Sequence, residues 1–166
     1  MSGALPDAWD TAAAIRDGSV SAVSVVSATL DRIATDRTNA FTLLTPDAAL
    51  AAAEEVDAGS RTGPLAGVPI SVKDHVWVEG LPATNGSRAL AGFVAPRSAV
   101  CVSRLVEAGA IIVGKTNNPE FCYRGITDSA RARSRTDPAS GPVTDSVGHP
   151  RKPGIFGTRP NVGLSP

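Results

Sequence analysis

The sequence predicts an α/β fold with a mixed or largely parallel sheet flanked by helices, and three observations support this class. Segments with helical spacing of apolar residues alternate with short apolar segments typical of strands. Glycines stand where the helices are expected to end. Aromatic residues make up only 4% of the 166 residues, so Ala, Val and Ile supply most of the apolar 42%, as is common in packed α/β layers. The chain is long enough for one domain with a hydrophobic core.

The N-terminal part of the chain predicts three helices and one strand. A helix is expected from about Asp7 to Asp17, and Ser21 can cap a second helix that carries an apolar stripe. The stretch "AFTLL", residues 40–44, is a short strand candidate. In "TPDAALAAAEEVDAG" Thr45 is the expected N-cap of a third helix, because proline follows at the first helical position and glycine stands at the end.

The stretch "GAIIVGKT", residues 109–116, fits the phosphate-binding pattern G-x-x-x-x-G-K-[ST]. A phosphate loop follows a strand and opens a helix, whereas helical spacing precedes this stretch, with Ser98 as the expected N-cap. Gly109 stands at a helix C-cap position, and residues 110–113 are apolar and mostly β-branched, as in a buried strand. We interpret the stretch as a helix end, a glycine stop and a strand. Nucleotide binding is the alternative.

Composition and charge point away from nucleic-acid and membrane partners. Charged residues make up 19% of the chain and the formal net charge is zero. The basic stretch "RARSR", residues 131–135, is interpreted as a solvated segment. No run of about 18 apolar residues occurs, and the first residues lack the basic and apolar regions of a secretory signal. A cytoplasmic location is therefore expected.

The two cysteines and two histidines predict neither a metal site nor a catalytic thiol. Cys101 and Cys122 are expected to be free thiols, buried or half-buried, since nothing in the spacing links His75 or His149 to either of them. Four such residues scattered along the chain do not have the spacing of a zinc site. No metal and no cofactor is expected.

Lys73 is the residue with the clearest chemical potential. It ends the apolar stretch "GVPISVK", in which Val68, Ile70 and Val72 alternate as in a strand. A lysine at such a strand end tends to be partly buried, and burial disfavours the ammonium, which can make the amine a general base. The alternative is a strand-end lysine that simply reaches solvent.

Three motifs, in this order, carry a family resemblance. They are "GPLAGVPISVKDHV" (residues 63–76), "GLPATNGS" (80–87) and "RLVEAGAIIVGKTNNPEF" (104–121). Together they resemble the amidase signature family, which includes broad-range amidases, fatty acid amide hydrolase and the A subunit of glutamyl-tRNA amidotransferase. The likeness extends from about residue 7 to residue 129. It implies that "GKTN" closes a core strand and binds no phosphate.

The resemblance also implies a chemistry. The family hydrolyses amide bonds with a Ser–Ser–Lys triad, and its lysine motif G-x-P-[IV]-x-[VL]-K-[DE] falls on Lys73, which would be the general base. The lysine takes a proton, through a serine on a cis peptide, from a nucleophilic serine that forms an acyl-enzyme. Backbone N–H groups of a glycine-rich turn stabilise the oxyanion, and neither a metal nor an organic cofactor takes part.

The serines of the triad are where this sequence departs from the family. The bridging serine belongs in a "GGSSGG" segment, and the nearest remnant is "DPASGP", residues 137–142, with Ser140 as its only serine. The stretch "VTDSVGHPRKPGIFGTRP", residues 143–160, resembles the nucleophile segment, but His149 occupies the nucleophile position and is expected to be non-functional. Ser146 lies three positions away, and errors of 1 Å in such geometry already cost about 10²-fold.

Two regions and two functions are therefore expected. Residues 1–129 would form the N-terminal part of an amidase-like domain, and residues 130–166 an irregular Pro/Gly-rich remnant of the nucleophile region. The first function is an amidase acting on small-molecule amides, truncated and internally deleted, with impaired or absent activity. The alternative is a non-catalytic pseudoenzyme or gene remnant that at most binds a partner. Exposed apolar faces and strand edges would favour homo- or hetero-oligomers.

Overall fold

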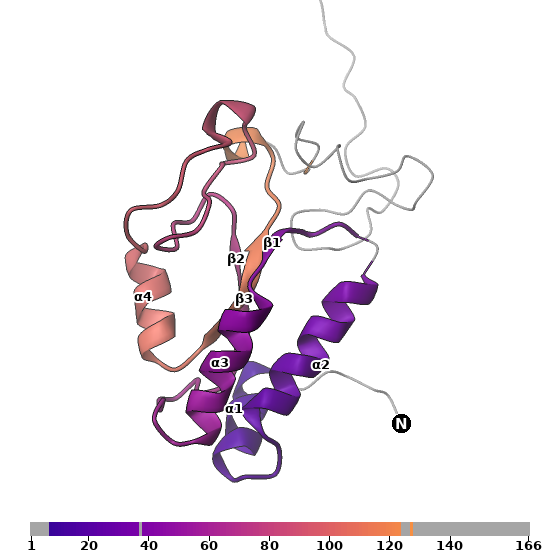
Figure 1. Cartoon of the computed structure of the whole chain (residues 1–166), viewed down its shortest axis with the longest axis vertical. Coiled ribbons are helices and arrows are strands. Elements are labelled where there is room, and N and C mark those ends of the chain that lie inside the picture. The colour runs from indigo at the N-terminus through magenta and orange to yellow at the C-terminus, as the bar shows by residue number, and fades with distance from the viewer. Residues whose placement is uncertain (1–6, 37, 124–126, 128–166) are drawn as a thin grey trace, which may run out of the picture.

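The computed structural model of the chain describes residues 7–36, 38–123 and 127 (Figure 1). The predicted C-terminal region, residues 130–166, lies outside them. The described elements follow one another in the order α1 (Ala8–Arg16), α2 (Ala22–Thr35), β1 (Phe41–Leu44), α3 (Pro46–Asp57), β2 (Pro69–Lys73), η1 (Arg88–Leu90), α4 (Val100–Glu107), β3 (Ile111–Thr116) and η2 (Glu120–Cys122). The α/β class and the predicted alternation of helices and strands are confirmed.

The three described strands form one mixed sheet in the order β1-β3-β2. The central strand β3 pairs antiparallel with β1 and parallel with β2. In the parallel pair Val72 lies opposite Lys115, and Lys73 lies opposite Thr116. The two carboxyl ends therefore meet at the same edge of the sheet, which is where ligands commonly bind in open α/β sheets.

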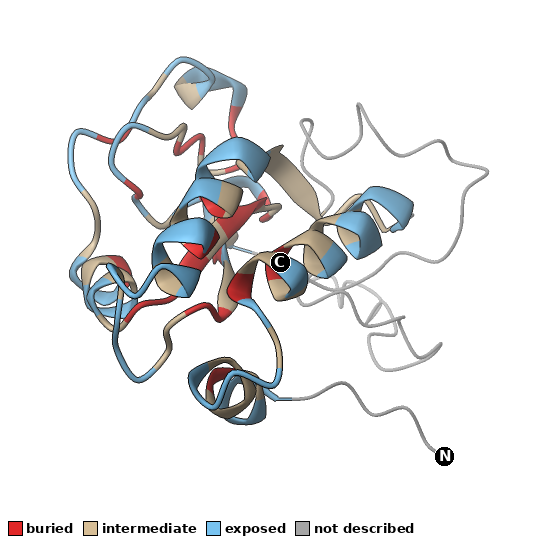
Figure 2. Cartoon of the chain, turned by 60° about the horizontal axis from the view of Figure 1, so that its bottom comes forward, coloured by how far each residue is buried: buried red, intermediate tan, exposed pale blue. Residues whose placement is uncertain are grey.

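Helices cover both faces of the sheet. On one face α2 and α3 pack against β3 in a core cluster formed by Ala22, Val26, Ala49, Ala53, Ile111 and Val113. On the other face Val102 of α4 packs with Val72 and Val78, and Ile112 borders this second cluster. Side chains alternate along β3 as in any strand, so one strand supplies both cores. Figure 2 shows the buried residues on the sheet and on the inner sides of the helices.

Local capping explains where the first helices begin. Asp7 caps α1 by accepting hydrogen bonds from the backbone N–H groups of Trp9 and Asp10, both at 2.8 Å. Ser21 caps α2 as predicted, since its Oγ accepts from Ser24 N at 3.1 Å. A side chain distant in sequence adds to this second cap.

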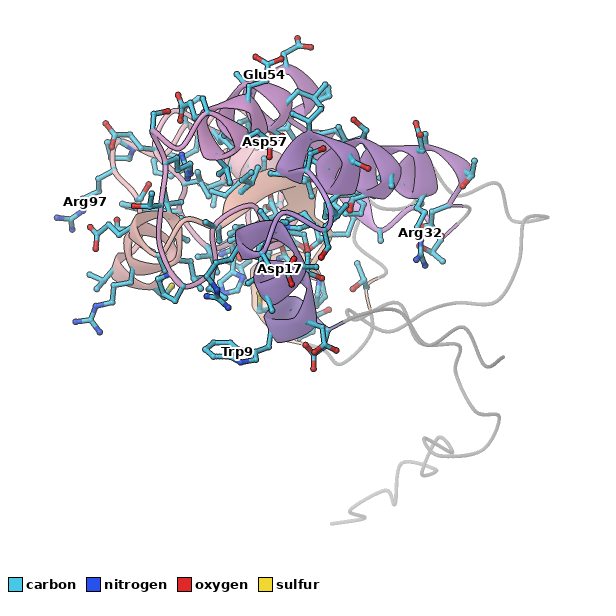
Figure 3. All side chains as sticks on the ribbon, turned by 90° about the horizontal axis from the view of Figure 1, so that it is seen from below. Trp9, Asp17, Arg32, Glu54, Asp57 and Arg97 are labelled. Carbon is cyan, nitrogen blue, oxygen red and sulfur yellow. The ribbon has the colours of Figure 1, made fainter. Side chains whose placement is uncertain are left out.

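That side chain is Asp57, the last residue of α3. Its carboxylate accepts from Ala22 N at 2.7 Å and from Val23 N at 3.1 Å, at the positive end of α2. Figure 3 shows Asp57 where α3 meets α2, whereas Arg32, Glu54 and Arg97 point outward. The contact ties the two helices of the first core cluster to each other.

One predicted cap is wrong, and another is right in position but makes no capping hydrogen bond. Ser98 is not the N-cap of α4. That position belongs to Ala99, and Ser98 Oγ instead accepts from Glu79 N at 3.0 Å. Thr45 stands at the N-cap position of α3 as predicted, but its hydroxyl donates to Ile112 O at 3.1 Å and caps no helix N–H. In both cases the hydroxyl bonds to a segment far away in sequence, which helix spacing cannot reveal.

The stretch 109–116 has the order helix, glycine and strand that we predicted. α4 ends at Glu107, and Gly109 follows in the left-handed region with φ +94°. The next residues, the variable positions of the phosphate-binding pattern, belong almost entirely to the buried strand β3. No helix follows in the way that a phosphate loop requires, because β3 leads into the short η2.

No helix among the described residues is both long enough and apolar enough to cross a membrane.

Candidate functional site

The candidate site lies at the edge of the sheet where β2 and β3 end. Two loops meet there, residues 74–87 after β2 and residues 117–123 after β3, and we call them together the carboxyl-edge loops. In Figure 1 they lie at the upper end of the sheet, with η2 beside the loop that leads to η1. Hydrogen bonds between the two loops hold them against each other.

Lys73 is the last residue of β2 and is half-buried. Its backbone begins a turn, because its carbonyl oxygen accepts from Val76 N at 2.9 Å. The next residue, Asp74, continues the parallel pairing by donating its N–H to Thr116 O at 2.8 Å. The sequence prediction that Lys73 ends a strand and is partly buried is confirmed. Its role as a general base stays a prediction.

The Asp74 carboxylate is buried, with 2% of the residue exposed, and it organises the first loop. Oδ2 accepts from the Thr84 hydroxyl at 2.8 Å and from Gly86 N at 3.2 Å, and Oδ1 accepts from Thr84 N at 3.4 Å. A buried carboxylate with three donors holds these groups in place. The turn after Lys73 is thereby fastened to residues ten and twelve positions further along the chain.

Lys115, in β3, is the most deeply buried cation among the described residues, with 0% of the residue exposed. Its ammonium donates to the backbone oxygens of Asp74 at 3.0 Å, Val76 at 2.7 Å and Pro82 at 3.1 Å. All three ammonium donors are thus satisfied. Burial lowers the pKa of Lys115 from its ordinary value, and the nearby Asp74 carboxylate opposes that shift.

The carbonyl contacts also settle what Lys115 does in the phosphate-binding pattern. In a phosphate loop the lysine reaches toward the phosphates. Here the ammonium has no donor left for a phosphate, since each donor faces a backbone carbonyl. The alternative of nucleotide binding at residues 109–116 is therefore not supported by the geometry.

His75 lies in the turn itself, exposed, and its charge state follows from its neighbours. Desolvation lowers the pKa of His75 most, the positive charge of Lys73 lowers it next, Asp74 raises it, and Lys115 lowers it further. The pKa of His75 therefore lies below its ordinary value of 6.5, and the neutral imidazole predominates at pH 7.

The second loop is held to the first by three contacts. The Ser87 hydroxyl donates to Glu120 Oε1 at 2.6 Å, and Phe121 N donates to Asn85 O at 2.9 Å. The Cys122 thiol lies 3.9 Å from Asn85 Oδ1. Asn85, Phe121 and Cys122 all have positive φ, between 49° and 57°. Backbone in this sparsely populated region persists only where its surroundings hold it, and such residues cluster at functional sites.

The loops approach so closely that only glycine fits at one point. Gly86 has φ +67°, and a Cβ atom there would lie 2.7 Å from the backbone oxygen of Asn118. Asn118 is itself buried, and its Oδ1 has no hydrogen-bond partner within the described residues. The sequence motif "ATNGS" is therefore explained by backbone packing next to the site.

The structure places one of the two predicted catalytic residues. Lys73 lies at the carboxyl edge of the sheet, whereas His149, Ser140 and Ser146 lie outside the described residues. Sequence reasoning missed Asp74 and Lys115 as parts of the same site. The signal was available in the pairing of two motifs, since parallel strands ending in "VKD" and "GKT" bring both lysines to one edge.

One of the two thiols, Cys101, and a hollow beside α2 lie apart from this network. Both cysteines are free as predicted, but Cys101 is exposed on α4, which corrects the expectation of a buried or half-buried thiol. A hollow of about 430 Å³ lies along the end of α2 and β1, lined by residues from Ile33 to Leu44. Neither Lys73 nor Lys115 lines it. Within the described part of the chain no group of His, Cys, Asp and Glu side chains could hold a metal ion.

The fold and the site define an α/β protein with a half-buried lysine at the carboxyl end of a parallel strand. A family model described as Amidase matches residues 24–147. The chain belongs to this amidase family.

Curated relatives agree. The chain is 40% identical over 184 residues to the A subunit of the glutamyl-tRNA(Gln) amidotransferase of Chloroflexus aurantiacus, a match that covers 91% of this chain and 38% of the relative. It is 46% identical over 128 residues to the indoleacetamide hydrolase of Bradyrhizobium diazoefficiens, covering 74% of this chain and 24% of the relative. The chain thus spans well under half the length of these relatives.

Solved structures show the same fold. Native peptide amidase from Stenotrophomonas maltophilia superposes with a TM-score of 0.70 at 33% identity, over 87% of this chain and 33% of that protein. A component of a vestigial protein complex related to the origins of an s-triazine catabolic enzyme superposes with a TM-score of 0.72 at 31% identity, over 84% of this chain and 30% of that protein. These neighbours confirm the expected partial amidase-signature fold.

Proposed function

We propose that this chain carries the lysine half of an amide-hydrolysing site, with Lys73 as the general base of a Ser–Ser–Lys mechanism. The observation that carries the proposal is the position of Lys73, half-buried at the end of β2 beside the fixed turn 73–76. The fixed turn holds the backbone from which the Lys73 amine projects, and a defined position is one requirement of a general base. The substrate would be a small amide.

We further propose that hydrolysis is impaired in this chain because the serines of the mechanism are missing or displaced. No "GGSSGG" stretch occurs, and His149 stands at the nucleophile position. An internal deletion is supported by the Chloroflexus match, which runs over 184 residues and so exceeds the 166 residues of this chain. By contrast, the match to the corresponding amidotransferase chain of Methanococcoides burtonii runs over 110 residues and covers 66% of this chain. The aligned length there is almost the same as the number of residues of this chain that it covers, so that shorter match needs no deletion.

The intact chain and its Lys73→Ala variant test the impairment. Without a nucleophilic serine, Lys73 has no hydroxyl proton to remove in the step that attacks the amide. We therefore expect both proteins to hydrolyse a small aryl amide at the same background rate. The measurement is release of the aryl amine over hours at pH 7 and pH 9. Turnover that disappears in Lys73→Ala would contradict the impairment, and Ser140, Ser146 and His149 would then be the residues to substitute.

A second candidate function is a non-catalytic protein that acts by binding a partner. It is favoured by large apolar side chains on the surface, among them Val100 with 69% exposed and Phe121 with 56% exposed. Sedimentation of the purified chain separates the two candidate functions. A binding role through these side chains predicts that the chain self-associates or is recovered together with a partner, and that Val100→Ser weakens this association. A monomer that stays unchanged in Val100→Ser would count against it.

A further inference from the structure

Lys115 is a buried cation that the proposed hydrolysis does not use, and its contacts all lead to the turn that carries Lys73. Its ammonium bonds to the carbonyl of Asp74, the residue directly after Lys73, and to the carbonyl of Val76. Val76 in turn donates its N–H to the carbonyl of Lys73 at 2.9 Å. Two of the three carbonyls that Lys115 holds therefore belong to this turn.

The third contact connects the turn to the rest of the first loop. Lys115 reaches the carbonyl of Pro82, while the Asp74 carboxylate holds Thr84 and Gly86. The two opposite charges thus fasten the same loop from two sides, Lys115 through backbone oxygens and Asp74 through backbone N–H groups and a hydroxyl. A buried charge persists only where its surroundings compensate it, so this network is costly to rearrange.

We infer that Lys115 is a positioning residue for Lys73: its ammonium fixes the turn after β2 and thereby the backbone from which the Lys73 side chain projects. The strand register supports this, because Lys115 lies opposite Val72, the neighbour of Lys73, on the adjacent parallel strand. A point charge with three donors is suited to gather three carbonyls, and an apolar side chain of equal length is not. Only the role of Lys73 as a base rests on the proposed function; the positioning of its turn does not.

The chain is well suited to a direct test, since it contains only three lysines, Lys73, Lys115 and Lys152. NMR of protein labelled at lysine side chains gives three resolvable sets of signals, and amide exchange reports on the turn itself. Neither readout depends on hydrolysis, so a failure of the proposed function leaves this test intact.

The informative variant is Lys115→Met, which keeps an unbranched side chain one atom shorter and removes the charge and all three donors. We expect a changed chemical shift for the Lys73 side chain and amide exchange about tenfold faster at Val76 and Gly86, because the carbonyls lose their common partner. Lys115→Arg, which keeps the charge and several donors, is expected to restore part of the protection.

The matched control is Val26→Ala, which opens the core cluster on the face covered by α2 and α3, away from the carboxyl-edge loops. The two variants are compared at temperatures at which they are equally stable. Under this condition Val26→Ala should leave the Lys73 chemical shift and the exchange rates of the turn amides as in the unmodified chain. Lys73 signals and turn amides that respond equally to Lys115→Met and Val26→Ala would overturn the inference, since Lys115 would then contribute only to stability.

A measurement on the unmodified chain covers the case in which Lys115→Met does not fold. The three donors of Lys115 each face a carbonyl, so its ammonium protons should exchange slowly with water and give a distinct signal at low temperature. A lysine side chain in a short peptide, measured in the same buffer, provides the comparison. Ammonium protons of Lys115 that exchange as fast as those of a lysine side chain free in water would overturn the inference.

Discussion

Asp74→Ala is expected to lower the free energy of unfolding by about 3–5 kcal/mol, the range typical of breaking a buried charged network by removing one partner. The substitution leaves three buried donors, the Thr84 N–H, the Thr84 hydroxyl and the Gly86 N–H, without their acceptor. It also removes the negative charge that compensates Lys115. Urea unfolding followed by circular dichroism measures the loss.

Two control variants show how much of the lost stability comes from the buried network of Asp74. Asp74→Asn keeps one acceptor oxygen and is expected to lose about half as much stability, because part of the hydrogen bonding survives without the charge. Glu54→Ala removes an acid that points outward on α3 and should change stability by less than about 0.5 kcal/mol. Equal unfolding midpoints for Asp74→Ala and Glu54→Ala would show that the Asp74 network does not hold the fold together.

Gly109→Ala is expected to destabilise the chain by about 2–4 kcal/mol, the sum of a left-handed backbone cost and an overpacking cost. Gly109 has φ +94°, and a Cβ atom there would lie 2.7 Å from Ala66 Cα and 2.9 Å from Ala66 N. Both are backbone atoms, which cannot turn aside as a flexible side chain can. Thermal unfolding of the variant measures the effect.

Gly92→Ala is the matched control, because no heavy atom lies within 4 Å of its Cβ position and its backbone is outside the left-handed region. It is expected to leave the stability unchanged or to raise it slightly by restricting the unfolded chain. A Gly109→Ala variant as stable as Gly92→Ala would contradict the close packing of the α4–β3 connection against Ala66.

Strand and helix positions could be predicted because each follows from local chemistry. Residues 110–113 are apolar and mostly β-branched, and a glycine stop precedes them, so they predict a buried strand despite the phosphate-binding pattern. The cap of α2 by Ser21 could be predicted because its hydroxyl accepts a hydrogen bond from an N–H group only three residues further along, that of Ser24. Signals of this kind are contained within a few residues of the chain.

The side-chain network of the site could not be predicted in the same way. Lys115 and Asp74 act on each other across 41 residues of sequence, and their contacts exist only after β2 and β3 have paired. The prediction that Ser98 caps α4 fails for the same reason, because the hydrogen-bond partner of its hydroxyl is the N–H of Glu79, 19 residues away. Exposure is equally non-local: Cys101 follows the helical apolar spacing, yet nothing in the described chain covers it.

The most direct test of the central claim joins residues 1–129 of this chain to the C-terminal remainder of the Bradyrhizobium indoleacetamide hydrolase, which matches this chain at 46% identity over 128 residues. The measurement is ammonia release from indoleacetamide. We expect turnover by the chimera, an unchanged rate in Arg97→Ala, and a loss of about 10²–10⁴-fold in Lys73→Ala, the usual contribution of a general base. A folded chimera without turnover, or one whose rate is indifferent to Lys73→Ala, would contradict the assignment of Lys73 as the base.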